Sequence, residues 1–291
     1  MKLKENTMGL PAISSDMTSA DLAILANTAV ENPQEQLATL RINYEKQDKK
    51  KNKLPRGIWA LPNKDTTVYG TDITTRVMIA SNQVREYSAK EGEYINETIF
   101  YNSAFDLKAE DIQGGYRCGK VTFAKREELP DSEQLAQHPK KYYRVLFGLA
   151  TLKGKDLNGN KAVAENIPFI MRLRGNSLKP INEYLDSFKD TGGNVFDYIT
   201  KWNIAEGEGG NVDYWITTPE RGEESPMLSS STIVDTFKGL LSWKEDFNEG
   251  VMAKWRKKNG LRVSKAADEA VEVAAVVIEP PFDDSLDDLI A

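Results

Sequence analysis

The sequence contains only one cysteine and one histidine, Cys118 and His138, in 291 residues. An intrachain disulfide is therefore impossible, and a reducing cytoplasm is the expected compartment. The same scarcity excludes a structural zinc site built from a Cys/His cluster. It also leaves no redundancy for a Cys–His or Ser–His catalytic pair.

Long apolar runs and nucleotide-binding motifs are also missing. No apolar stretch approaches the roughly 20 residues that span a bilayer, and residues 1–6 lack the apolar character of a signal peptide. Neither GxxxxGK(S/T) nor GxGxxG is present, which argues against a P-loop nucleotidase and a dinucleotide enzyme. We therefore expect no membrane segment, no cofactor, no metal ion and no catalytic activity. Metal chemistry based on carboxylates alone stays open, because acidic residues are abundant.

The charge that is present is unevenly distributed. The formal net charge is −6, but residues 266–291 carry eight acidic residues and no Lys or Arg. Residues 46–174, in contrast, hold 23 basic and 16 acidic residues. A basic middle with an acidic end is typical of a polyanion-binding body that carries an interaction tail.

Local patterns divide the chain into four parts. They are a helical N-terminal segment with a basic connector (1–55), a β domain (56–175), a helical and hairpin extension that packs on it (176–262), and a flexible linker with an acidic tail (263–291). Capping and proline signals predict helices over 18–30, 33–47, 177–189 and from 229–231 to about 259, with Gly250 as a point of interruption. The glycine-rich residues 206–210 predict a hairpin between 202–205 and 212–218.

The β domain reads as a series of short strands. They are expected at 57–61, 73–80, 84–88, 98–102, 116–124, 142–152 and 168–174. Several strands without alternating helices favour a barrel or a sandwich.

Strand parity suggests a polar face on this domain. In residues 140–149 an apolar face containing Val145 and Phe147 leaves Tyr142 and Arg144 on the opposite face, and strands 168–174 and 73–80 each present Arg in the same way. Non-specific single-strand binders need this combination, because cations follow the phosphates and aromatic rings accept any base. Arg and Tyr are also common on the solvated side of any sheet, and a lysine run is often a solvated linker. The candidate nucleic-acid-binding residues are Lys50, Lys51, Lys53, Arg56, Trp59, Arg76, Arg85, Tyr87, Tyr101, Tyr116, Lys120, Lys140, Tyr142, Arg144, Arg172 and Arg174.

The C-terminal tail alternates paired acids with apolar residues after Pro280 and Pro281. A segment this short and acidic cannot bury enough surface to fold alone. It can occupy the basic face when DNA is absent, present its apolar residues to basic-rimmed pockets on other proteins, or simply solubilise the chain. The candidate partner-binding residues are Asp283, Asp284, Leu286, Asp287, Asp288, Leu289 and Ile290.

With these features the chain resembles bacterial and bacteriophage single-stranded DNA-binding proteins, most of all the phage replication type. The resemblance is architectural and covers residues 56–175 and 279–291. It implies an α+β protein with an OB-like, mostly antiparallel β-barrel, helical appendages and a disordered acidic tail. It also implies coating of single-stranded DNA in replication, recombination and repair in a bacterial or phage-infected cell, with the tail recruiting polymerase, helicase or primase. The tip ends in Leu-Ile-Ala, which departs from several relatives.

Three alternatives remain open at this point. The chain could be a virion or assembly protein without affinity for single-stranded DNA, with its tail docked on a basic partner. It could be a metal-dependent nuclease that uses carboxylates among Glu86, Glu93, Glu97 and Asp106. It could also bind RNA, because stacking surfaces do not distinguish the two nucleic acids without 2′-hydroxyl contacts. Self-association on DNA is a further expectation.

Overall fold

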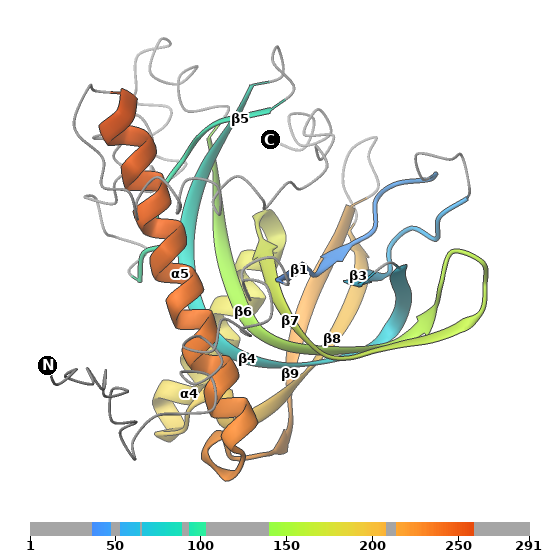
Figure 1. Ribbon diagram of the computed structural model, residues 1–291. Helices are drawn as coiled ribbons and strands as arrows, with labels where there is room; N and C mark the ends of the chain where they lie inside the picture. The colour runs from blue at the N-terminus through green and yellow to red at the C-terminus, as the bar shows by residue number, and fades with distance from the viewer. Residues whose placement is uncertain are drawn as a thin grey trace, which may run out of the picture.

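The computed structural model describes residues 37–47, 53–64, 66–88, 93–102, 140–207 and 214–258. These residues form a nine-stranded sheet and two α-helices, which confirms the mixed α+β class (Figure 1). The strands are β1 (Ala38–Thr39), β2 (Arg41–Ile42), β3 (Trp59–Asn63), β4 (Thr66–Ser88), β5 (Glu93–Glu97), β6 (Lys140–Lys155), β7 (Lys161–Leu173), β8 (Tyr198–Gly207) and β9 (Tyr214–Glu224). The helices are α4 (Leu178–Thr191) and α5 (Ser231–Lys258), with short 3-10 turns η2 (Gly175–Ser177), η3 (Val195–Asp197) and η4 (Met227–Ser229).

The sheet order is β1-β7-β6-β4-β3-β2, with β5 paired to β4 and the β8–β9 hairpin joined to β4 through β8. All pairs are antiparallel except β1 with β7. Within the described residues these pairings do not establish a closed barrel, so the expected OB-like barrel is not confirmed. Because β8 pairs with β4, the predicted hairpin extension and the predicted β domain share one sheet.

Strand β4 is continuous over 23 residues, although two separate strands were expected around Ser81-Asn82-Gln83. All three are fully buried, and the Asn82 and Gln83 side chains are hydrogen-bonded, whereas the Ser81 hydroxyl has no hydrogen-bond partner among the described residues. The Asn82 backbone pairs with Tyr101 in both directions, and the Gln83 amide donates to the Thr98 carbonyl at 3.2 Å. A polar triplet favours a break between two strands, but tertiary partners satisfy the side-chain amides of Asn82 and Gln83, and the strand is continuous.

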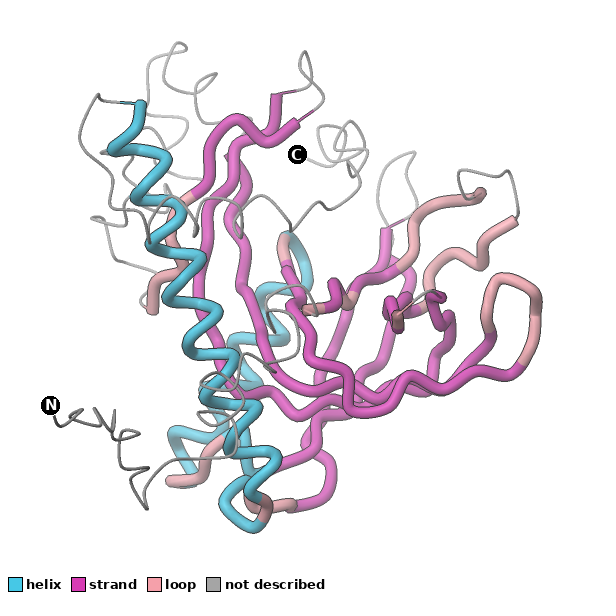
Figure 2. The backbone as a smooth tube through the Cα atoms, viewed as in Figure 1, coloured by secondary structure: helices cyan, strands magenta, loops and turns pink. Residues whose placement is uncertain are grey.

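The long strands bend sharply, as the smooth backbone trace shows (Figure 2). The β4–β6 register shifts between Tyr69 and Asp72 and again between Val77 and Ile79. Such irregularities add local twist and bend a sheet. The bend brings backbones very close: a Cβ on Gly148 would lie 1.8 Å from the Arg76 carbonyl oxygen, so only glycine fits there.

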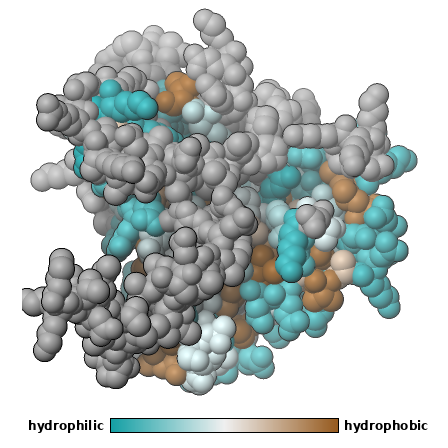
Figure 3. Space-filling view, viewed as in Figure 1, coloured by the Kyte–Doolittle hydropathy of each residue, from teal (hydrophilic) through white to brown (hydrophobic). Residues whose placement is uncertain are grey.

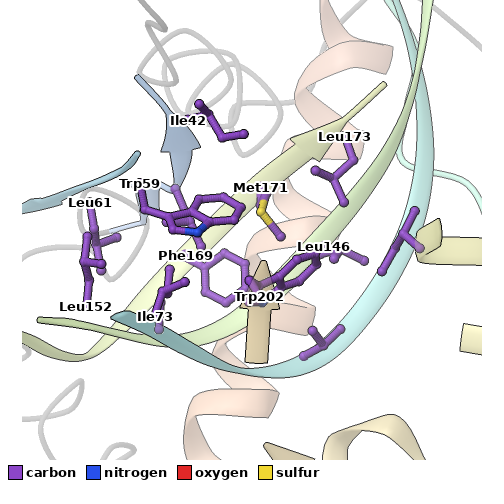
Figure 4. Close-up of a cluster of buried hydrophobic side chains, with 14 of the residues drawn as sticks. Ile42, Trp59, Leu61, Ile73, Leu146, Leu152, Phe169, Met171, Leu173 and Trp202 are labelled. Atoms are coloured by element: carbon purple, nitrogen blue, oxygen red, sulfur yellow. The ribbon is translucent and has the colours of Figure 1, made fainter. Parts of the chain in front are cut away.

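Hydrophobic cores cover both faces of the sheet. On the inner face of the bend, Trp59 packs edge-on against Trp202, with ring centroids 5.8 Å apart, among side chains from β3, β4, β6 and β7 (Figure 4). Helix α4 adds Ile181, Tyr184 and Phe188 to this inner core. On the opposite face, α5 lies along the sheet and packs Leu240, Trp243, Phe247 and Val251 on Val145, Phe147 and Ile170.

Both helices and the hairpin agree with the sequence patterns. Helix α4 ends at Gly192, whose left-handed conformation (φ 67°) suits glycine. Ser177 precedes the helix as predicted, but its hydroxyl accepts a hydrogen bond from the Thr217 amide instead of capping the helix. Helix α5 runs through Gly250 without interruption. In the described residues, neither helix carries an apolar stretch long enough to cross a bilayer.

The helix expected over residues 33–47 is wrong over its described part, residues 37–47. This segment forms β1 and β2, which pair with β7 and β3 respectively. Leu40 and Ile42 point into the inner core while Arg41 between them is half-buried. This alternation has a period of two, and long-range pairing supplies the backbone partners that a helix would have provided. The helix expected over 18–30 lies outside the described residues.

Candidate nucleic-acid interface

The predicted single basic face does not form, because the register places its arginines on opposite sides of the sheet. Arg144 is directly opposite Leu173, which belongs to the inner core, whereas Arg172 is opposite Val145, which packs on α5. Directly opposite residues share a face, so Arg144 lies on the inner face and Arg172 on the α5 face. The alternation of side chains did not identify a solvated face, because β6 and β7 are apolar on both faces in their middle and contribute to both cores.

Four of the predicted residues, Trp59, Arg76, Arg85 and Tyr101, are buried. Trp59 and Tyr101 are 1% and 4% exposed, so their rings are not accessible to bases in this structure. Arg76 is 6% exposed and donates to the backbone carbonyls of Phe196 and Ser225 and to the Ser225 hydroxyl. Burial lowers the pKa of Arg76, and Asp197 opposes that shift. Arg76 therefore ties β4 to the turns around η3 and η4.

Tyr142 and Arg144 converge on one amide of β4. The Tyr142 hydroxyl and the Arg144 guanidinium donate to the Asn82 side-chain oxygen at 2.6 and 2.8 Å. The Asn82 amide nitrogen donates in turn to the carbonyls of Tyr101 and Asn102. Burial raises the pKa of Tyr142 and lowers that of Arg144. This group holds the segment after β5 against the sheet.

Arg85, Arg172 and Arg174 lie on the face of the sheet that α5 covers, and each contacts other side chains of the protein. Arg85 lies 3.5 Å above the Tyr94 ring and 3.6 Å from a Glu97 carboxylate oxygen. The other Glu97 oxygen lies 3.8 Å from the Lys254 ammonium of α5. Arg172 donates to the Gln83 side chain at 3.0 Å, and Arg174 lies 6.0 Å from the Tyr143 ring centroid.

Lys53 and Arg56 lie on the segment that links β2 to β3. Hydrogen bonds to Asn43 hold this segment in place. The Asn43 amide nitrogen donates to the Pro55 carbonyl at 2.6 Å, and the Asn43 carbonyl accepts the Gly57 amide at 2.9 Å. The Leu54 amide donates to the Lys46 carbonyl, which turns the segment back on itself. Residues 46–56 contain six basic residues and one acidic residue.

This segment lies against an aromatic ring of β9. The Trp215 and Tyr44 rings meet edge-on with centroids 4.9 Å apart, and the Arg56 guanidinium lies 5.2 Å from the Trp215 centroid. Arg56 also donates to the Tyr44 carbonyl at 3.0 Å. Gly57 has φ +69°, and a Cβ there would lie 2.3 Å from the indole nitrogen of Trp215, so the ring packs directly on the glycine backbone. We call Tyr44, Arg56 and Trp215 the Trp215 cluster.

The Trp215 cluster has the composition of a stacking site. All three of its side chains are half-buried, and Lys46 and Lys53 on the same segment are exposed. Partly accessible aromatic rings beside guanidinium and ammonium groups can bind a base and its phosphate together. Sequence reasoning identified Lys53 and Arg56 from the basic run but missed Tyr44 and Trp215, because no local pattern links β9 to this segment.

Several predicted residues fall outside what the structure describes. Lys50, Lys51, Tyr116 and Lys120 lie outside the described residues, as do Asp283, Asp284, Leu286, Asp287, Asp288, Leu289 and Ile290 of the tail. Tyr87 and Lys140 are described in their backbone only, in β4 and β6.

Among the carboxylates suggested for a nuclease, Glu97 is held between Arg85 and Lys254, and Asp106 lies outside the described residues. In the part of the chain that the structure describes, no three His, Cys, Asp or Glu side chains come together as a metal site would require.

No family model matches the chain, and comparison with curated proteins and with solved structures gives no match.

Proposed function

We propose that this protein binds single-stranded DNA without sequence preference, in phage or bacterial replication, recombination and repair. The observation that carries the proposal is the Trp215 cluster. A half-buried indole contacts Tyr44 and Arg56, at the end of a segment with six basic residues and one acidic residue. In this proposal the bent sheet serves as an OB-like scaffold, and a base stacks on the accessible part of the Trp215 ring.

The binding mode follows from the chemistry of these groups. Stacking of a base on an aromatic side chain contributes about 1–3 kcal/mol and is tolerant of base identity. Lys46, Lys53 and Arg56 supply positive charge for neighbouring phosphates, and phosphate binding releases counterions. The affinity is therefore expected to fall steeply with salt and to depend little on sequence.

The acidic tail has a separate role in this proposal. Residues 283–291 contain four acidic residues and three large apolar residues, Leu286, Leu289 and Ile290. This composition suits a short recruiting segment for replication proteins with apolar pockets rimmed by basic residues. Charge complementarity with residues 46–174 also favours its competition with DNA for the basic body.

The test is a titration at several salt concentrations, followed for the wild type by quenching of intrinsic fluorescence with poly(dT) and for all variants by the anisotropy of a dye-labelled oligo(dT). Trp215→Leu retains an apolar side chain against the core but removes the ring, and we expect it to weaken binding by about 5- to 150-fold, which corresponds to 1–3 kcal/mol. Trp255→Leu, at a half-buried tryptophan of α5, is the matched control and should bind as the wild type does. A wild-type protein without affinity for poly(dT) would refute the proposal and favour an assembly protein.

A further inference from the structure

The β6–β7 hairpin carries three exposed lysines on one side. Lys155 and Lys161 are directly opposite each other at the end of the ladder, and Lys153 is two residues before Lys155. Opposite residues in an antiparallel pair, and residues two apart on one strand, share a face of the sheet. Lys153, Lys155 and Lys161 therefore form one basic face, which we call the hairpin arm.

The arm lysines form no ion pairs in the part of the chain that the structure describes. None of the three forms an ion pair with a described residue, and Asp72, which is opposite Lys153 on β4, is not within ion-pair distance. The nearby Asp156 carboxylate instead accepts three hydrogen bonds from Asn158 and Asn160 within the turn. Like charges directly opposite each other destabilise a sheet, so Lys155 and Lys161 do not serve the stability of the hairpin.

Exposed lysines elsewhere differ in this respect. Lys179, Lys189 and Lys238 are also solvent-exposed, and each lies within 4 Å of an acidic side chain on its own helix, Glu183, Asp186 and Asp235 respectively. The unpaired state of the arm lysines is therefore not a general property of the surface of this protein.

The arm and the Trp215 cluster lie on opposite faces of the sheet, because Leu152 and Ala164, which alternate with the arm lysines, belong to the inner core against which Tyr44 and Trp215 pack. Tyr69 pairs with Lys155 on one side and with Ala60 on the other. Lys155 is thus two strand spacings, about 10 Å, from the strand that follows Arg56 and Gly57. In Figure 1 the hairpin projects at the same end of the molecule as the segment between β2 and β3.

The surface of the arm is not purely polar. Leu157 in the turn and Val163 on β7 are 42% and 53% exposed. In the space-filling view hydrophilic and hydrophobic residues are interspersed at this end of the molecule (Figure 3). A nucleic-acid single strand presents phosphates together with apolar faces of sugars and bases, and a surface of this kind matches both.

We infer that the hairpin arm is a second contact for the same DNA strand, in which Lys153, Lys155 and Lys161 bind phosphates where the strand continues beyond the Trp215 cluster onto the opposite face of the sheet. The inference rests on the proposed function and extends the interface from the inner face of the sheet to the opposite face. The contact is electrostatic and independent of base identity. It contributes to the salt dependence of binding and not to the quenching of tryptophan fluorescence.

The test compares two triple variants of the full chain that lose the same charge. One is K153A/K155A/K161A, and the matched control is K179A/K189A/K238A. Each lysine–phosphate contact contributes about 0.7 to the slope of log Kobs against log salt for a single strand. The arm variant should therefore lose about 2 from the slope and bind poly(dT) more weakly, with unchanged maximal quenching. The control should retain the wild-type slope.

The outcomes separate the two proposals. If the wild type binds poly(dT) but the arm variant has the same slope as the control variant, the arm is not a DNA contact, while the proposed function stands. If the wild type does not bind at all, both proposals are wrong. The acidic tail is a second polyanion that could bind the arm, and binding of a synthetic peptide of residues 279–291 to the arm variant tests this. If the arm variant loses peptide binding while its DNA slope is unchanged, the arm binds the acidic peptide and not DNA. The thermal midpoint should not fall in the arm variant, since removal of Lys155 and Lys161 relieves repulsion.

Discussion

Gly57→Ala is the sharpest perturbation of the Trp215 cluster, because it changes no charge and removes no aromatic ring. Gly57 has φ +69°, a conformation that costs an L-residue about 1–2 kcal/mol. The new Cβ would also lie 2.3 Å from the Trp215 indole nitrogen and 2.6 Å from Cε2. The Gly57 amide is hydrogen-bonded to the Asn43 carbonyl at 2.9 Å, so we expect the ring to move and not the backbone.

Gly192→Ala separates backbone strain from ring displacement. Gly192 has nearly the same dihedral, φ +67°, but no heavy atom lies within 4 Å of a Cβ placed there. Gly192→Ala should therefore lose about 1–2 kcal/mol of stability in urea unfolding, and Gly57→Ala at least as much. Only Gly57→Ala displaces Trp215, so it alone should lose the stacking contribution of about 1–3 kcal/mol, or 5- to 150-fold in Kd.

The assay is a poly(dT) titration at fixed salt and protein concentrations where both variants are folded. We expect Gly192→Ala to bind as the wild type does and Gly57→Ala to bind at least about 5-fold more weakly. Equal affinities for the two variants would refute the reasoning, since they would show that the position of the Trp215 ring is irrelevant to DNA.

Three further predictions concern the core, the arm turn and the tail. Arg76→Met leaves the Phe196 and Ser225 acceptors without their buried donor, so the free energy of unfolding in urea should fall by about 3 kcal/mol, and a loss under 1 kcal/mol would contradict this role. Hydrogen bonds from Asn160 and Asn158 lower the pKa of Asp156, so its contribution to the turn is present above the ordinary pKa of about 3.9 and is lost as the pH falls further. The protection factors of the Asn158 and Asn160 amides, which correct for the intrinsic pH dependence of exchange, should fall in that acidic range; constant protection factors would exclude a carboxylate-held turn. Deletion of residues 283–291 should tighten DNA binding and abolish recruitment of partner proteins, and unchanged values for both would refute a role for the tail.

Local patterns in the chain predicted much of the secondary structure. The glycine-rich residues 206–210 mark the turn region of the β8–β9 hairpin, and the apolar periodicity of residues 233–255 corresponds to α5. Two errors have the same cause. Residues 38–42 and 81–83 were misassigned because their backbone and side-chain partners come from distant strands, which no local window contains.

The candidate site shows the same division. Parity correctly predicted which residues of β6 alternate, but not which face each strand shares with its neighbour, because register is a property of the pair. Arg144 and Arg172 therefore separated, while Lys155 and Lys161 came together without any signal in either strand alone.

The sequence by itself determined the α+β class, the helices after residue 177 and the basic middle followed by an acidic end, since these depend on composition and on short-range periodicity. Only the tertiary structure decided that Trp215 lies beside Arg56, that Arg76 is internal and that three lysines share one side of a hairpin. The physical reason is that these neighbours are set by strand register and by the bend of the sheet, which arise from contacts between residues far apart in the chain.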